Sequence, residues 1–183
     1  MTLAERLLAV DAALARAEIP HAFGGALALA YWTREPRGTR DLDLNIFLPP
    51  SQADRVRAAL PGGVAWTDDA DRAIARDGQA RVMWDDTPVD LFFDYAPIHV
   101  EAARHRRIVP FADTVIPVLG PVELAAFKAV YDRTRDWADI EDMIRADSLD
   151  TVALRRLLDG MLDPGDRRLG RLADAESRAR TEG

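Results

Sequence analysis

The 183-residue chain has no cysteine, only three histidines, and no apolar run as long as a membrane span. Without cysteine there can be no disulfide, thiolate metal site or cysteine nucleophile. Its apolar runs all fall short of the ~20 residues that a transmembrane helix needs. The N-terminus has no basic segment leading into an apolar one, so it does not resemble a secretory signal. We therefore expect a cytoplasmic protein that makes no use of a membrane.

The histidines and serines offer little catalytic chemistry. His21, His99 and His105 are too far apart in the sequence for the usual metal-ligand spacing, and no serine lies in a nucleophile-elbow context. The formal net charge is −7, which argues against a broad nucleic-acid surface, because such a surface must be basic. With 48% hydrophobic and 30% charged residues, the composition is that of a globular domain with its own core.

Two aspartates interrupt an otherwise apolar segment near residue 42. Asp41 and Asp43 alternate with Leu42 and Leu44, and residues at i and i+2 of a strand share a face. The leucines would then face the core while both carboxylates project together. Carboxylates are depleted in strands and costly to bury alone, so their pairing favours a cation between them. Mg²⁺, which prefers carboxylate and phosphate oxygens, is the obvious candidate.

A glycine pair precedes these aspartates. Gly24 and Gly25 follow the short apolar strand predicted over 21–23 and open an Ala- and Leu-rich helix that reaches about Trp32. A helix N-terminus after a glycine turn presents free N–H groups, which suit phosphate. The alternative is that the glycines only permit tight packing between strand and helix. The aspartates downstream favour the phosphate interpretation.

The remaining pattern predicts an α+β fold: a small mixed β-sheet core with flanking helices and a C-terminal helical part. Pro117 suggests that the last strand lies at a sheet edge. We expect a core over residues 1–118, C-terminal helices over 119–163 packing on the same domain, and a charged tail over 164–183 that is partly disordered or weakly helical. The predicted helices cover 3–17, 52–60, 97–107, 121–133, 136–146 and 149–162; the predicted strands cover 21–23, 40–48, 81–84, 89–93 and 114–119; a charged loop with room for a short helix covers 64–80, and a turn covers 85–88.

The glycine pair and the segment Arg37-Gly38-Thr39-Arg40-Asp41-Leu42-Asp43-Leu44 resemble the first motif of the polymerase-β-like nucleotidyltransferase superfamily. The closest likeness is to minimal bacterial AbiEii/AbiGii-type enzymes, several of which are toxins of toxin–antitoxin pairs. Asp90, within the apolar run 89–93, resembles the third carboxylate of that superfamily. Lys128 and Asp139 resemble the helical lysine and later aspartate of the toxin branch. Many relatives have Gly-Ser where this chain has Gly-Gly, which leaves only backbone N–H groups for phosphate.

This resemblance implies a nucleotidyltransferase that moves NMP from an NTP to a hydroxyl acceptor with two Mg²⁺ or Mn²⁺ ions. The acceptor would be tRNA, protein or a small molecule, and an antitoxin would be a partner. The implied metal-binding and catalytic residues are Asp41, Asp43 and Asp90. The implied nucleotide-binding residues are Gly24, Gly25, Arg37, Arg40 and Lys128.

The sequence leaves open alternative roles for individual residues and alternative functions for the chain. Asp139 either orients Lys128 or the acceptor, or both residues are ordinary exposed helical charges. The chain could also be a non-catalytic nucleotide- or partner-binding module on the same fold, or an antibiotic-type enzyme that modifies small molecules. The retention of all three aspartates favours the enzyme.

Overall fold

The structure, a computed structural model, describes residues 1–181. The chain divides into two compact units. Unit 1 contains Met1–Leu27 and Gly38–Leu119, and unit 2 contains Ala28–Arg37 and the chain from Gly120 onward. Helix α2 (Gly25–Thr33) begins in unit 1 and continues into unit 2.

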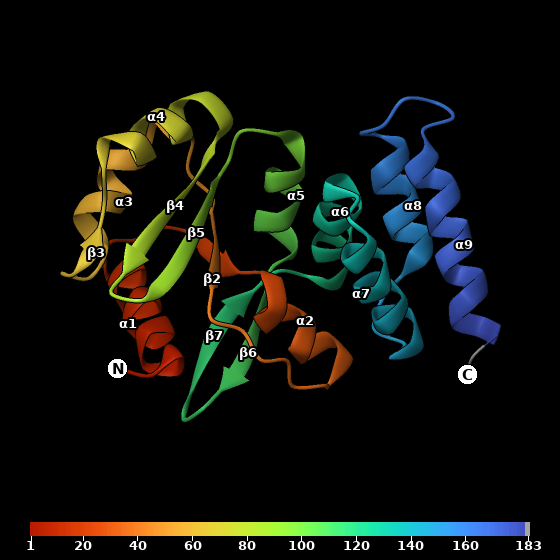
Figure 1. The fold of residues 1–183 in the computed structure, drawn as a ribbon, viewed down its shortest axis with the longest axis horizontal. Helices are drawn as coiled ribbons and strands as arrows, with labels where there is room; N and C mark the ends of the chain where they lie inside the picture. The colour runs from red at the N-terminus through yellow and green to blue at the C-terminus, as the bar shows by residue number, and fades with distance from the viewer. Residues whose placement is uncertain (182–183) are drawn as a thin grey trace. The chain divides into compact units, whose positions relative to one another are not determined.

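Unit 1 is built on a seven-stranded mixed sheet with the strand order β3-β4-β5-β2-β1-β7-β6 (Figure 1). Strands β2 and β5 run parallel at its centre, and β4 and β5 form an antiparallel hairpin. The mixed sheet confirms the predicted α+β class. The strands are β1 (His21–Phe23), β2 (Leu42–Ile46), β3 (Val64–Ala65), β4 (Gln79–Trp84), β5 (Thr87–Phe93), β6 (Arg107–Phe111) and β7 (Thr114–Val118).

Short helices complete unit 1. The first of them begins with a capping box, in which Thr2 and Glu5 each accept a hydrogen bond from the other's backbone N–H. Helix α1 packs against α3, and α4 packs against β4. The helices are α1 (Leu3–Arg16), the start of α2, the 3₁₀ turn η1 (Pro50–Gln52), α3 (Ala53–Ala59), α4 (Asp68–Asp77) and α5 (Pro97–His105).

Helix α4 occupies most of the segment predicted as a charged loop. The Thr67 hydroxyl accepts a hydrogen bond from the Ala70 N–H. Three aspartates lie in the first turn, where their negative charges interact favourably with the positive end of the helix dipole. Gly78 ends the helix in the left-handed conformation. Only Ala70 and Ile74 are buried, and this sparse apolar stripe explains why the hydrophobic pattern alone indicated so short a helix.

The prediction that the last strand lies at a sheet edge was wrong. Strand β7 lies between β1 and β6, and the edge on this side of the sheet is β6, a strand that the sequence did not predict. Pro117 is tolerated inside the sheet because β7 pairs with β1 only at Phe23 and Val118, beyond the proline. The edge strand carries Pro110, at the kind of position where proline is ordinarily found.

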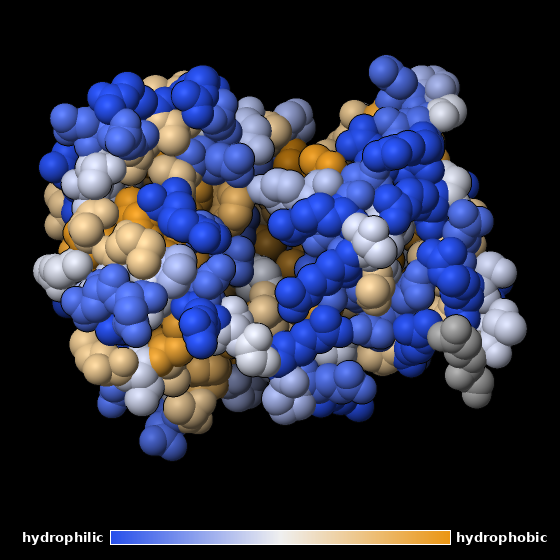
Figure 2. Space-filling model, viewed as in Figure 1, coloured by the Kyte–Doolittle hydropathy of each residue, from blue (hydrophilic) through white to orange (hydrophobic). Residues whose placement is uncertain are grey.

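Unit 2 is helical. Helix α6 packs against α7 and α8, and both α7 and α8 pack against α9. The helices that follow α2 are α6 (Pro121–Tyr131), α7 (Thr134–Arg145), α8 (Thr151–Asp159) and α9 (Arg167–Thr181). Hydrophilic residues cover most of the visible face of α8 and α9, as Figure 2 shows.

Helix α9 corrects the prediction of a weakly helical tail. Its apolar residues are few, but Leu172, Ala175 and Ala179 recur at helical spacing and are buried. This narrow stripe packs against α7, so tertiary contact stabilises a helix whose own composition is strongly polar. Within residues 1–181, no helix combines the length and apolarity that a membrane crossing requires.

Candidate active site

The site is built across three neighbouring strands of unit 1. Asp43 on β2 lies opposite Asp90 on β5 in the parallel register. Asp90 in turn lies opposite Arg81 on β4 in the antiparallel hairpin. Directly paired residues of neighbouring strands share a face, so these three side chains form a row on one face of the sheet. The sequence placed the two aspartates on separate strands, and only the register brings them together.

Alternation of apolar and polar residues explains why the row faces outward from the core. Leu42 and Leu44 on β2 are buried, as are Val89 and Leu91 on β5. Because successive side chains of a strand point to opposite faces, Asp43 and its counterpart on β5 must project from the other side. The predicted inward leucines are therefore confirmed.

Asp41 lies just outside the strand. The sequence predicted a strand from Arg40, whereas β2 begins at Leu42. The Asp41 N–H donates to the Thr39 hydroxyl at 3.2 Å, which holds the approach to the strand. The Asp41 side chain is 39% exposed, compared with 19% for Asp90, so it lies at the more open margin of the site.

The glycine pair lies directly against Asp43. The Gly24 N–H donates to the Asp43 carbonyl oxygen at 2.9 Å. Gly25 has a φ of +54°, and a Cβ built on it would overlap the Asp43 carboxylate. Glycine is therefore required here both by backbone conformation and by close approach. The carboxylate lies at the start of α2, where the helix dipole and free N–H groups favour negative charge.

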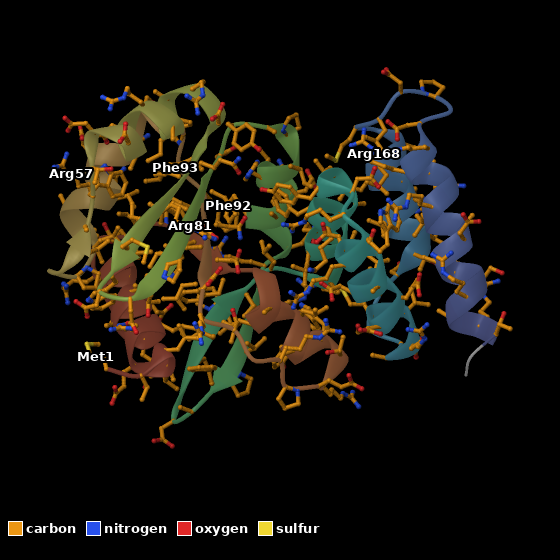
Figure 3. The ribbon with its side chains drawn as sticks, viewed as in Figure 1. Met1, Arg57, Arg81, Phe92, Phe93 and Arg168 are labelled. Carbon is orange, nitrogen blue, oxygen red and sulfur yellow. The ribbon has the colours of Figure 1, made fainter. Side chains whose placement is uncertain are left out.

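An arginine that the sequence reasoning missed lies among the carboxylates. Arg81 Nε lies 2.7 Å from Asp90 Oδ1, Arg81 Nη2 lies 2.7 Å from Asp90 Oδ2, and Nη2 also lies 3.3 Å from Asp41 Oδ2. Figure 3 labels this arginine on the β4–β5 hairpin. The hydrogen bond to Asp90, and then the charge of that carboxylate, raise the Arg81 pKa, with smaller contributions from Asp41 and Asp43. The guanidinium therefore stays charged.

Carboxylates are the ligands that a divalent metal ion takes, and the strand register places Asp43 beside Asp90. The three carboxylates of Asp41, Asp43 and Asp90 do not, however, come together around one point. Among residues 1–181, no three acidic or histidine side chains lie close enough together to hold a metal ion. Mg²⁺ commonly takes one or two carboxylates together with waters and substrate phosphates, so the opposed Asp43 and Asp90 are a suitable protein contribution. The bond between Arg81 and Asp90 occupies oxygens that such an ion would need.

Lys128 and Asp139 belong to unit 2, and they are not solvated helical charges. Lys128 Nζ lies 2.6 Å from Asp139 Oδ2 and 3.9 Å from Asp136 Oδ1. Arg37 approaches the same aspartate, with Nη1 2.5 Å from Asp139 Oδ1, and it also pairs with Asp142. The alternative of exposed charges was wrong, because these side chains are largely buried in an ion-pair network. The nucleotide-binding roles of Arg37 and Lys128 stay predictions.

Arg40, the other predicted nucleotide-binding arginine, is exposed in unit 1. Two further partners in unit 2, Asp136 and Asp142, were given no role from the sequence. Asp136 was a detectable candidate, since it stands three residues before Asp139 and thus one turn away on the same helix face.

Two solved structures share this fold over most of the chain. The crystal structure of ANT(2")-Ia in complex with adenylyl-2"-tobramycin aligns with a TM-score of 0.54 and 16% identity, covering 97% of this chain and 99% of that one. An antigenic nucleotidyltransferase-like protein from Paracoccidioides brasiliensis aligns with a TM-score of 0.52 and 16% identity, covering 97% and 87%. At this identity the likeness establishes the fold: that of a nucleotidyltransferase.

The sequence itself defines the family. Residues 6–181 match the nucleotidyl transferase AbiEii toxin family of type IV toxin–antitoxin systems. The match spans nearly the whole chain, so the protein belongs to this family. Membership implies a nucleoside triphosphate substrate, divalent metal ions and an antitoxin. A comparison with curated proteins gives no match.

Proposed function

We propose that this protein is an active toxin enzyme that transfers NMP from an NTP to a hydroxyl group on tRNA or protein. The observation that carries the proposal is the register of β2 and β5, which sets Asp43 opposite Asp90 while the Asp43 carboxylate lies against Gly25. Two acidic side chains and a helix N-terminus at one place supply groups for both a cation and a phosphate.

Each residue of unit 1 has a role in this proposal. Asp41, Asp43 and Asp90 would hold Mg²⁺ or Mn²⁺, which when bound supplies Lewis-acid stabilisation of the transferring phosphoryl group. Asp90 would accept the proton of the attacking hydroxyl, because it is a partly exposed carboxylate beside Asp43 in the row. Gly25 would offer its backbone N–H to phosphate oxygens, since this chain has no serine at that turn. The Gly24 N–H already donates to the Asp43 carbonyl oxygen, so Gly24 would contribute by letting the phosphate approach the backbone closely.

The test is label transfer. The purified protein would be incubated with each of the four α-³²P-labelled NTPs, Mg²⁺ or Mn²⁺, and separate pools of tRNA, total protein and an aminoglycoside. We expect label to move to tRNA or protein with one preferred nucleotide, and an Asp43→Asn variant to transfer none. No transfer to any acceptor with any NTP would support the alternative of a non-catalytic nucleotide- or partner-binding module.

The aminoglycoside arm tests a second candidate function. ANT(2")-Ia, which shares this fold over nearly the full length of both chains, was crystallised with an adenylylated aminoglycoside. Label on the aminoglycoside alone would identify a small-molecule nucleotidyltransferase.

A growth assay adds a readout independent of the acceptor. Expression of the wild-type chain should arrest growth as expected of a toxin, and expression of Asp43→Asn should not.

A further inference from the structure

Arg81 holds oxygens that a metal ion would need. Both carboxylate oxygens of Asp90 accept hydrogen bonds from the Arg81 guanidinium, each at 2.7 Å, and Asp41 Oδ2 accepts a third from it at 3.3 Å. A divalent ion ligated by these carboxylates would need the same lone pairs. It would also lie next to a fixed positive charge that repels it. The Arg81 pair and metal binding at Asp90 therefore exclude one another.

From this exclusion we propose that Arg81 is a built-in competitor for the metal: it pairs with Asp90 and offsets part of the negative charge of the aspartates in the free protein, and it must leave Asp90 before an ion binds. This inference rests on the proposed function, because it assumes that the aspartates are the metal site. It goes further by assigning a role to a residue outside the predicted set. The consequence is a metal affinity lower than the carboxylates alone would give.

The pair is built so that it can open. The Arg81 side chain is 55% exposed, so its guanidinium can turn into water, and the Asp90 carboxylate that it leaves, 19% exposed, would gain the metal ion as its new partner. Partly exposed ion pairs contribute little to stability, and so the fold does not depend on this one. By contrast, Arg6 is buried and is held by Asp85, Asp86 and Thr87 on the β4–β5 turn, which is the pattern of a structural arginine.

The register explains why the competitor is so well placed. Arg81 and Asp90 are a directly opposed pair on neighbouring strands, at the separation where cross-strand charges interact. Asp43 is the next residue along the same row. The arginine therefore reaches Asp90 without leaving its own strand position. Only the side chain, and no backbone, has to move for the carboxylates to become available.

The test measures Mn²⁺ binding by the electron paramagnetic resonance signal of the free ion, for the full-length wild type and for Arg81→Gln. We expect Arg81→Gln to bind Mn²⁺ about fivefold tighter, since loss of an ion pair near the upper end of the usual strength has that effect. The matched control is Arg57→Gln, which removes the same charge from a half-exposed arginine that pairs with Asp71 on another part of unit 1. Its affinity should stay within about twofold of the wild type.

A double variant, Arg81→Gln with Asp90→Asn, shows where the gain arises. We expect it to lose the tighter binding. If the double variant kept the gain, or if Arg81→Gln bound Mn²⁺ no tighter than the wild type, Arg81 would not be a competitor, although the proposed function would stand. Failure of all variants to bind Mn²⁺ would overturn both this inference and the metal-dependent function. Circular dichroism should give nearly equal melting temperatures for Arg81→Gln and the wild type.

Discussion

Lys128 Nζ lies 2.6 Å from Asp139 Oδ2, and the two side chains are only 12% and 5% exposed. Their helices, α6 and α7, are consecutive in the chain, and the ion pair joins them within unit 2. Arg37 contributes a second cation to the same carboxylate. A buried carboxylate with two cationic partners is well satisfied, whereas loss of one partner leaves charge insufficiently compensated.

Lys128→Met should therefore destabilise the protein. It keeps an unbranched apolar stem but removes the ammonium, and we expect a loss of about 1–3 kcal/mol, because Arg37 still pairs with Asp139. Chemical denaturation measures the change. The matched control is Arg133→Met, since Arg133 pairs with Asp136 but has a 70% exposed side chain. If Lys128→Met were no more destabilising than this control, the buried pair would have no structural role. Nucleotide binding by the same variant tests the role that the family resemblance gives Lys128.

Gly25→Ala should damage both stability and activity. The positive φ alone costs an L-residue about 1–2 kcal/mol, and the new Cβ would push the Asp43 carboxylate out of place. Gly38→Ala is the control, because an added Cβ there meets nothing within 4 Å. Thermal unfolding and label transfer measure the two effects. Normal turnover by Gly25→Ala would show that the position of Asp43 does not matter for the reaction.

Asp90→Asn separates an enzyme from a binding module. The variant keeps the side-chain shape but loses the negative charge and the proton acceptor, so turnover should fall by about 10²–10⁴-fold. Its melting temperature should change little, because Arg81, the partner that the variant leaves behind, has a 55% exposed side chain. Asp113→Asn, an exposed site in the β6–β7 turn, controls for the change of net charge. Full turnover by Asp90→Asn would refute the catalytic assignment, and outright unfolding would make Asp90 a structural partner of Arg81.

His99 should make the protein less stable in mild acid. Burial lowers the His99 pKa and outweighs the opposing effects of the Ala96 carbonyl and the Asp94 charge. In the unfolded chain the imidazole takes up its proton near pH 6.5, but in the folded protein it does so only at lower pH. The unfolded state thus binds more protons in this window, and the contribution of His99 to stability is lost as pH falls from about 7 to 5.

Urea unfolding at several pH values measures this slope. His99→Gln, which cannot take up a proton, should reduce the dependence of stability on pH over that range. His105→Gln serves as the control, because the His105 side chain is 51% exposed. An unchanged slope in His99→Gln would mean that His99 does not cause the acid sensitivity.

The sequence by itself determined the parts of the site that depend on local chain geometry. The alternation of polar and apolar residues around Asp43 predicted a strand with buried leucines and an outward carboxylate, because the side-chain period of a strand is two, although Asp41 lies just before the strand. The glycine pair before an apolar helix predicted the turn that meets Asp43. The family resemblance then predicted Asp90 as the third carboxylate, which stays a prediction. These signals are short in range, so they can be read from a few consecutive residues.

Tertiary structure decided which of these groups meet. The predicted four-residue turn over 85–88 would have paired Arg81 with Phe92. The actual two-residue turn at Asp85 and Asp86, with Asp85 at φ +53°, pairs Arg81 with Asp90 instead. Such a slip of two residues keeps the face but changes every partner, and the hydrophobic pattern cannot detect it. Likewise, Arg37 lies 102 residues from Asp139 in the chain, and only the packing of unit 2 buries them together.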